Sequence, residues 1–344
     1  MNYQLLGRTG LRVSDLSLGT MTFGEEWGWG ANKEESRRMF DTYAEAGGNF
    51  LDTANGYTEG TSERFVGEFV KADRSRFVVA TKYTFSTTAG DPNSGGNHRK
   101  NLVQALEASL KRLELEYIDL YWVHAWDSLT PIGETMRGLD DLVRAGKILY
   151  VGVSDAPAWV VSRANTMAEL RDWSPFVALQ IEYNLIERTP ERELIPMARE
   201  LGLTVTPWSP LAGGMLAGKY KRGAAVEQGR LKESPFADFS DRNFDIAEAV
   251  TAVAKEAGRS ASLVALAWLR QKNTLPIIGA RTPAQLKDNL GSLEFDLSGD
   301  QMAKLDAASA ITPGFPGNFL GRPFVVERLY AGTRERIRGR QESA

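Results

Sequence analysis

Four polar residues that could together transfer a proton follow apolar runs in the first half of the chain: Asp52, Tyr57, Lys82 and His124. A phenol alone is a poor acid at neutral pH, with an ordinary pKa of about 10. A neighbouring ammonium group such as that of Lys82 would stabilise the phenolate and lower this pKa. Asp52 could hold the ammonium charged and in place. His124 could orient a carbonyl group or share in the proton transfer.

Each of these residues also has an ordinary structural explanation. Asp52 could cap a loop, Tyr57 could pack on a rim, Lys82 could be a surface cation and His124 could be a core histidine. Their joint placement favours a site, because they lie at or just after the ends of predicted strands two to four. In a (β/α)8 barrel, the carboxyl ends of the strands form the catalytic face.

Short apolar runs alternate along the chain with segments of helical periodicity, which is the pattern of repeated β-α units. The predicted strands cover residues 18–20, 49–52, 77–82, 118–124, 148–154, 177–182, 203–208 and 275–279. Eight strands are the number of an α/β TIM barrel, the (β/α)8 fold. We therefore expect one domain over residues 1–344, with its barrel core at about 16–310.

Other segments are expected to flank the strands. Helix starts are predicted at Asn32 before 33–46, Thr61 before 62–70, Thr130-Pro131 before 132–144 and Thr189-Pro190 before 191–201. An N-terminal β-hairpin is expected at 3–15, where it could plug the bottom of the barrel. Two long connections, 84–97 and 211–242, are expected to be functional lids or disordered segments, and a tail follows at 313–344.

The composition excludes several classes of function. The net charge of −3 gives no electrostatic case for binding nucleic acid or a membrane surface. The tail arginines, which include Arg338 and Arg340, alternate with glutamates, as in a solvated helix or a frayed end. The chain has no cysteine, so disulfides and thiolate chemistry are excluded. It also shows no signal peptide or membrane span, and the cytoplasm is the expected location by default.

The segments around the four polar residues resemble those of the aldo-keto reductases, and the resemblance covers almost the whole chain. Residues 50–57, 80–82 and 119–124 match the catalytic segments of that family, and 152–154 and 180–184 match later ones. The resemblance implies a (β/α)8 barrel that binds a nicotinamide dinucleotide without a Rossmann fold. It also implies that Tyr57 is the general acid, that Lys82 and Asp52 tune it, and that His124 positions the substrate. No metal is needed.

The resemblance also assigns residues to the cofactor. Trp208 falls where the family stacks an aromatic ring on the nicotinamide, and Ser154 and Gln180 match residues that bond its carboxamide. Asp155 stands where asparagine is commoner. Arg281 matches the residue that contacts the adenosine 2′-phosphate. The full expected set is Gly19, Thr20, Met21, Asp52, Ser154, Gln180, Trp208, Ser209, Leu211, Gly213, Gly214, Ile278, Gly279, Ala280, Arg281, Gln285, Asp288 and Asn289.

Two departures from the family pattern affect the choice of cofactor. Gln285 replaces an arginine found in some branches, and Asp288 replaces a commoner glutamate. The match of Arg281 implies that NADPH is the preferred cofactor, whereas these two departures leave NADH possible.

Aromatic residues just after predicted strands one, three and four could wall a mostly apolar substrate pocket. They are Phe23, Trp27, Trp29, Tyr83, Phe85 and Trp126. Aromatic side chains are also common core material. With the four polar residues, they predict an NADPH-preferring oxidoreductase that reduces aldehydes or ketones to alcohols. The alternatives are a cofactor-binding regulatory subunit of the same fold, like the potassium-channel β-subunits, and a barrel lyase that uses Lys82 to form a Schiff base.

Overall fold

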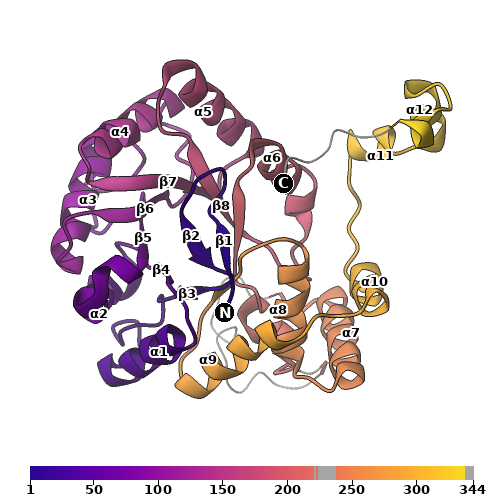
Figure 1. Cartoon of the computed structure of the whole chain (residues 1–344), viewed down its shortest axis with the longest axis horizontal. Coiled ribbons are helices and arrows are strands. Elements are labelled where there is room, and N and C mark those ends of the chain that lie inside the picture. The colour runs from indigo at the N-terminus through magenta and orange to yellow at the C-terminus, as the bar shows by residue number, and fades with distance from the viewer. Residues whose placement is uncertain (221, 224–237, 338–344) are drawn as a thin grey trace.

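The computed structural model describes residues 1–220, 222–223 and 238–337. Eight parallel strands form a nearly closed barrel in the order β10-β3-β4-β5-β6-β7-β8-β9, with helices around it (Figure 1). The strands are β3 (Ser17–Gly19), β4 (Phe50–Asp52), β5 (Val78–Tyr83), β6 (Ile118–Val123), β7 (Ile148–Ser154), β8 (Phe176–Glu182), β9 (Thr204–Trp208) and β10 (Ile277–Ile278). Leu275 N donates to Val205 O at 2.9 Å across the remaining gap. The predicted (β/α)8 barrel is confirmed.

The alternation of side chains along each strand divides the apolar residues into two cores. One core fills the barrel and includes Phe50, Val78, Ala80, Trp122 and Ala178. The other contains the residues between them in sequence, which pack against the helices. A side chain that continues the inner series therefore reaches the interior at the carboxyl end of its strand.

The N-terminal hairpin fills the bottom of the barrel, as predicted. Strands β1 (Tyr3–Leu5) and β2 (Arg12–Ser14) pair antiparallel. Leu6 and Val13 are fully buried and belong to the interior core. The barrel is therefore open to large ligands only at the opposite rim.

Gly152 shows how tightly the interior is packed. A Cβ atom at this position of β7 would lie 2.3 Å from the ring of Trp122 on the neighbouring strand. Only glycine leaves room for the tryptophan, which is fully buried.

The helices that cover the barrel are α1 (Lys33–Glu45), α2 (Thr61–Val70), α3 (Arg99–Leu113), α4 (Ile132–Arg144), α5 (Ala158–Arg171), α6 (Leu194–Leu201), α7 (Asp241–Ala257), α8 (Ala261–Gln271), α9 (Pro283–Leu290) and α10 (Gly299–Ala308). Helix α1 begins as predicted, because the Asn32 side chain accepts a hydrogen bond from Glu35 N at 3.0 Å.

Helix α4 has its predicted bounds, but its predicted cap and two other predicted helix starts are wrong in detail. Helix α2 includes Thr61 and is preceded by Gly60, whose φ of 83° ends the turn before it. Pro131 occupies the position before α4, because the Thr130 hydroxyl donates to Asp127 instead of capping the helix. Residues Thr189–Glu191 form a separate 3₁₀ turn, and α6 begins only at Leu194.

The tail leaves the barrel as two short helices, α11 (Gly317–Leu320) and α12 (Pro323–Leu329), which project from the rest of the chain (Figure 1). Of the predicted connection after the seventh strand, residues 221 and 224–237 lie outside the described part, as do Arg338 and Arg340 of the tail. Among the described helices, none combines the length and apolar character needed to cross a membrane.

Candidate active site

Lys82 lies at the centre of the predicted cluster. Its ammonium group donates to the Asp52 carboxylate, to Thr53 O at 2.9 Å and to the Tyr57 hydroxyl at 3.2 Å. Asp52 ends β4 and Lys82 is the last inward residue of β5, so strand pairing brings them together. Their predicted contact with Tyr57 is present in the structure.

The charge state of Lys82 follows from its partners. Burial alone would lower the pKa of this fully buried ammonium, but the charges and hydrogen bonds of Asp52 and Tyr57 outweigh burial and raise it above its ordinary value. Lys82 is therefore protonated at neutral pH and faces the phenol as a cation. This is the arrangement that favours the phenolate form of a tyrosine.

A tight turn after β4 presents Tyr57. The residue begins the 3₁₀ turn η1 (Tyr57–Gly60), and its N–H donates to Ala54 O at 3.2 Å. Thr58 follows with a left-handed φ of 44°, and its hydroxyl donates to Phe23 O at 2.6 Å. The backbone on both sides of Tyr57 is thus anchored.

His124 follows β6 and lies beside the phenol. Its ring centroid is 5.9 Å from that of Tyr57 and 4.5 Å from that of Phe85. Burial, together with the charge of Lys82, lowers the pKa of His124 well below its ordinary value. The imidazole is therefore neutral at neutral pH, with one N–H to donate and one nitrogen lone pair.

The cluster continues toward β7 and β8 through a link that the sequence did not predict. Gln180 Nε2 donates to the second carboxylate oxygen of Asp52 at 3.0 Å, so Asp52 joins Lys82 to the predicted cofactor side. Ser154 pairs with Gln180 in strand register. The Ser154 hydroxyl is buried near the Asp155 carboxylate and has no hydrogen-bond partner of standard geometry among the described residues. A buried hydroxyl of this kind fits a ligand amide.

Trp208 ends β9 on the same rim. Its indole N–H donates to the Asp155 carboxylate at 3.1 Å. Asp155 has a left-handed φ of 46°, a conformation that aspartate and asparagine tolerate better than most residues. No local sequence pattern predicts the contact between Asp155 and Trp208, because 53 positions separate the two residues.

The loop after Trp208 suits close approach of a ligand to the backbone. Gly213 and Gly214 lie in the turn η4 (Ala212–Ala217) with φ of 64° and 101°. Ser209 also has a positive φ, and its carbonyl accepts a hydrogen bond from Asn184 Nδ2 at 3.0 Å. Leu211 precedes the turn and is half-buried. Ser209, Leu211, Gly213 and Gly214 could therefore lie along a bound pyrophosphate group, which is the role expected for them from the sequence.

Beyond β10, the start of α9 presents the residues predicted for the adenosine end. Thr282 caps the helix, and Gln285 Oε1 accepts the backbone N–H of Arg281 at 3.0 Å. The Arg281 side chain is exposed, and no hydrogen bond or ion pair to its guanidinium occurs within the described residues. Asn289 Nδ2 donates to Gly279 O at 3.2 Å, and Asp288 accepts a hydrogen bond from Ser260. A guanidinium beside a capped helix start fits a phosphate.

The remaining predicted cofactor residues lie at the ends of β3 and β10. Gly19 and Met21 flank Thr20, whose hydroxyl is buried and donates to Asp52 O at 3.0 Å. The side chains of Ile278 and Ala280 are buried in the outer core, so only their backbones could meet a cofactor.

Two of the six aromatic residues that were predicted to wall the substrate pocket are buried away from it in the structure. Phe23 is 1% exposed and packs on Phe69 in the outer core. Tyr83 is 0% exposed and stacks on Tyr121, because it follows the inward Lys82 and so points outward. Neither side chain can wall a pocket that is open to substrate. Both predictions were wrong.

The other four aromatics lie at the rim. Trp27 contacts Trp29 and the edge of Tyr57, with centroid distances of 5.6 and 6.4 Å. Phe85 lies over His124 as described above. Trp126 packs on Trp159, which the sequence analysis missed, at 5.7 Å. Trp159 lies in the first turn of α5 and is 57% exposed.

Glu182 is a second residue that the sequence analysis missed. It continues the inner series of β8 two residues after Gln180, and it pairs in register with Trp208. Burial, reinforced by the charges of Glu187 and Asp155, raises the pKa of this carboxyl to about 7. The group therefore titrates near neutral pH.

The raised pKa predicts how stability depends on pH. The fold favours the neutral form of Glu182, so this stabilisation is complete below pH 4.5 and is lost as the pH rises through about 7. Glu182→Gln cannot ionise, so its Tm relative to the unmodified chain should be higher at pH 8 than at pH 5. Because the group is partly solvated, we expect a gain of about 2 °C, measured by thermal unfolding. The same substitution at the exposed Glu193 should show no such gain, and equal effects at both positions would contradict the assignment.

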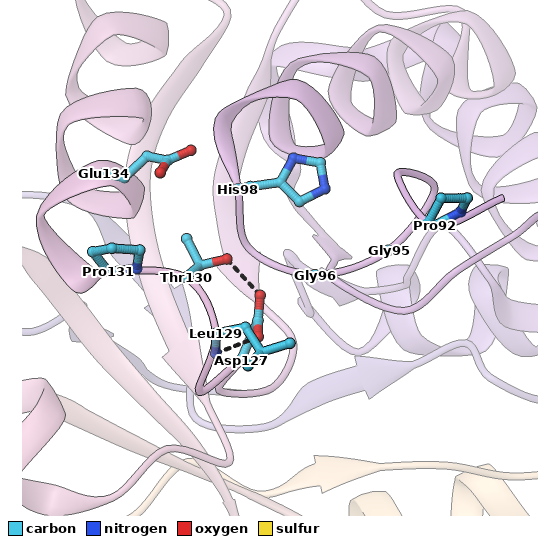
Figure 2. Close-up of a pocket in the computed structure, with 9 residues that line it drawn as sticks. All are labelled: Pro92, Gly95, Gly96, His98, Asp127, Leu129, Thr130, Pro131 and Glu134. Carbon is cyan, nitrogen blue, oxygen red and sulfur yellow. Dashed lines mark hydrogen bonds between the residues drawn. The ribbon is translucent and has the colours of Figure 1, made fainter.

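A cavity of about 420 Å³ lies apart from this cluster, between the loop after β5 and the start of α4 (Figure 2). Figure 2 shows His98, Asp127 and Glu134 around it. The Asp127 carboxylate accepts hydrogen bonds from Leu129 N at 2.8 Å and from Thr130, so it holds its own loop. Neither Tyr57 nor Lys82 lines this cavity, and it is separate from the candidate site.

Comparison with known proteins identifies the family. The sequence profile of the aldo/keto reductase family matches residues 15–310. The chain belongs to this family. Its membership makes it an oxidoreductase of carbonyl compounds and alcohols.

The chain is similar in sequence to several named aldo/keto reductases. It is 38% identical over 339 residues to an aryl-alcohol dehydrogenase (NADP(+)) of Phanerodontia chrysosporium, covering 91% of this chain and 87% of that protein. It is 38% identical over 322 residues to an aryl-alcohol dehydrogenase of Pestalotiopsis microspora, with coverage of 90% and 83%. A norsolorinic acid reductase of Aspergillus flavus is 36% identical over 328 residues, with coverage of 92% and 83%.

Proposed function

We propose that this aldo/keto reductase interconverts aromatic aldehydes or ketones and the corresponding alcohols, using NADPH and NADP+, with Tyr57 as the general acid and base. The observation that carries the proposal is the bonded series from Tyr57 through Lys82 to Asp52. It supplies a phenol whose conjugate base is stabilised by a buried cation. Such a group can give a proton to a carbonyl oxygen and take it back from an alcohol.

The residues of the chain have separate tasks in this reaction. In the reductive direction, the Tyr57 O–H bond breaks and its proton goes to the substrate oxygen, while Lys82 stabilises the phenolate left behind. Asp52 keeps Lys82 charged and in place. The neutral His124 donates an N–H to the carbonyl oxygen and so orients it. The bound nicotinamide supplies the hydride for reduction or accepts it in oxidation.

The cofactor would lie along the rim from Trp208 to α9. Trp208 would stack on the nicotinamide, and Ser154 and Gln180 would bond its carboxamide. The unpaired Ser154 hydroxyl supports this assignment. Arg281 would meet the 2′-phosphate, and its guanidinium, which has no partner within the described ranges, favours NADPH over NADH.

The aromatic rim supports the substrate class. Trp27 contacts both Trp29 and Tyr57, Phe85 contacts His124, and Trp126 and Trp159 form a further aromatic pair at the rim. Aromatic side chains bind aromatic ligands through edge and stacking contacts. The names of two relatives, which are aryl-alcohol dehydrogenases, agree with this class.

The Schiff-base lyase has no support from the geometry. Its nucleophile would have to be a neutral, accessible amine. Lys82 is instead fully buried, and Asp52 raises its pKa.

The test is turnover with matched carbonyl compounds. Purified protein is mixed with NADPH and with benzaldehyde, naphthaldehyde or hexanal, and the absorbance of the reduced cofactor is followed. We expect both aromatic aldehydes to exceed hexanal in kcat/KM. Cofactor binding without turnover of any aldehyde or alcohol would instead support the regulatory subunit.

The stacking role of Trp208 gives a further prediction. Trp208→Ala should weaken NADPH binding by about 1 kcal/mol, or about fivefold, which is a typical energy for an aromatic pair. Trp208→Phe keeps a ring and should lose less. Isothermal titration calorimetry measures both. Equal affinity in the alanine variant and the unmodified chain would mean that Trp208 only packs on the rim.

A further inference from the structure

Two carboxylates that the catalytic reaction does not use lie beside Trp208. We infer that Asp155 and Glu182 make the nicotinamide end of the site bind NADP+ more tightly than NADPH, and that this preference grows as the two carboxyls ionise. The inference rests on the proposed function, because it takes Trp208 as the surface on which the nicotinamide stacks.

The strand geometry places both groups around the same ring. Asp155 accepts the indole N–H of Trp208 at 3.1 Å. Glu182 is the register partner of Trp208 on the adjacent strand, and its side chain belongs to the inner series of β8. No hydrogen bond or ion pair reaches the Glu182 carboxylate from the described residues.

The charges around the two carboxylates leave a local excess of negative charge. Asp155 is faced by the Lys82 ammonium, which is already bonded to Asp52. Glu182 is faced by Glu187 and by Asp155, which are both acidic. Unlike Asp52, neither Asp155 nor Glu182 has a cation bonded to it within the described residues.

A nicotinamide ring would feel this excess differently in its two redox states. The oxidised ring carries a positive charge that the reduced ring lacks, whereas the rest of the dinucleotide is the same. Nearby carboxylates attract the cationic ring and have no comparable effect on the neutral one. They therefore act on the difference in affinity between NADP+ and NADPH.

The local excess of negative charge beside Trp208 also depends on pH. The pKa of Glu182 is about 7, and burial raises that of Asp155 above its ordinary value, although Trp208 and Lys82 oppose the rise. A cationic ring favours the ionised carboxyls, so NADP+ binding should expel protons from them. By linkage, NADP+ affinity must then increase with pH through this range.

Conservative variants can remove each charge separately. Asp155→Asn keeps an oxygen that can accept the Trp208 N–H and tolerates the left-handed backbone. Glu182→Gln keeps the shape of the side chain. Thermal unfolding of each variant confirms that it is folded.

The experiment measures the Kd of NADP+ and of NADPH from pH 6 to 8.5 by quenching of tryptophan fluorescence, with Trp208→Phe to assign the signal. The ratio Kd(NADPH)/Kd(NADP+) cancels the titration of the 2′-phosphate, which both cofactors carry. We expect this ratio to rise about tenfold over the range, which corresponds to a pKa shift of one unit on binding. NADP+ should also release protons into weakly buffered solution at pH 7, and NADPH should release fewer.

The two variants decide the assignment. Glu182→Gln should hold the ratio within about twofold across the range, and Asp155→Asn should lower it at every pH above 7. If both cofactors bind but the ratio Kd(NADPH)/Kd(NADP+) does not change with pH, the inference is overturned and the proposed function stands. The same holds if neither variant alters this ratio. Failure of both cofactors to bind would overturn the proposed function together with the inference.

Discussion

Tyr57→Phe should lower kcat by about 10²- to 10⁴-fold, which is the usual contribution of a positioned general acid. The phenyl ring can keep the contacts with Trp27 and His124, whose centroids lie 6.4 and 5.9 Å from that of Tyr57. Only the hydroxyl that faces Lys82 is removed. The Kd of NADPH should therefore stay nearly the same, as measured by fluorescence, while single-turnover reduction of an aromatic aldehyde becomes slow.

A buried tyrosine supplies the matched control. The hydroxyl of Tyr83 is buried and has no hydrogen-bond partner in the part of the chain that the structure describes, and its ring faces the helices rather than the site. Tyr83→Phe should keep kcat within about twofold of the unmodified enzyme, because it removes no catalytic proton. Near-normal kcat in Tyr57→Phe, or equal losses in both variants, would contradict the assignment of the proton donor.

Arg281→Ala should weaken NADPH binding by about 10- to 100-fold and change NADH binding little. The 2′-phosphate is the only difference between the two cofactors, and a charge-assisted hydrogen bond contributes roughly 1.5–3 kcal/mol. The guanidinium has no partner among the described residues and is free to meet the phosphate. Calorimetric titration with each cofactor at low and high salt measures the effect, and salt should reduce the NADPH advantage.

Lys287 provides the control for this variant, because it is an exposed cation within α9, whereas Arg281 precedes that helix. Lys287→Ala should change the ratio of the two affinities by less than about twofold, since an exposed charge at a distance is screened. Equal losses of NADPH and NADH in Arg281→Ala would indicate damage to the loop. No loss of either would make Arg281 an ordinary surface residue.

The sequence was sufficient for the strands and the central cluster. Apolar runs bounded by turns predicted all eight barrel strands, and the seven-residue strand β7 has its predicted limits. Asp52, Lys82 and Tyr57 meet as predicted, because neighbouring parallel strands end at the same rim. The types of these residues, together with their positions at the ends of predicted strands, were therefore enough to predict the cluster.

The sequence was insufficient where the direction of a side chain or a distant partner decides the outcome. Tyr83 was predicted to line the pocket, but it comes one residue after the inward Lys82 and so faces the helices. The hydrogen bond from Gln180 to Asp52 joins residues 128 positions apart, and no local pattern announces it. The pKa of Glu182 is raised by burial and by the acidic neighbours that the fold places beside it, and the sequence alone does not show either of these.

The plugged bottom of the barrel has a consequence for the order of events during synthesis. The interior core joins Leu6 and Val13, which precede the first barrel strand, to Leu275, which precedes the last one. β3 likewise finds one of its two neighbours only when β10 appears. Contacts of such long sequence separation form slowly, because a long loop must close before any of them is gained. The interior core around Leu6 and Val13 is therefore complete only after almost the whole barrel has been synthesised.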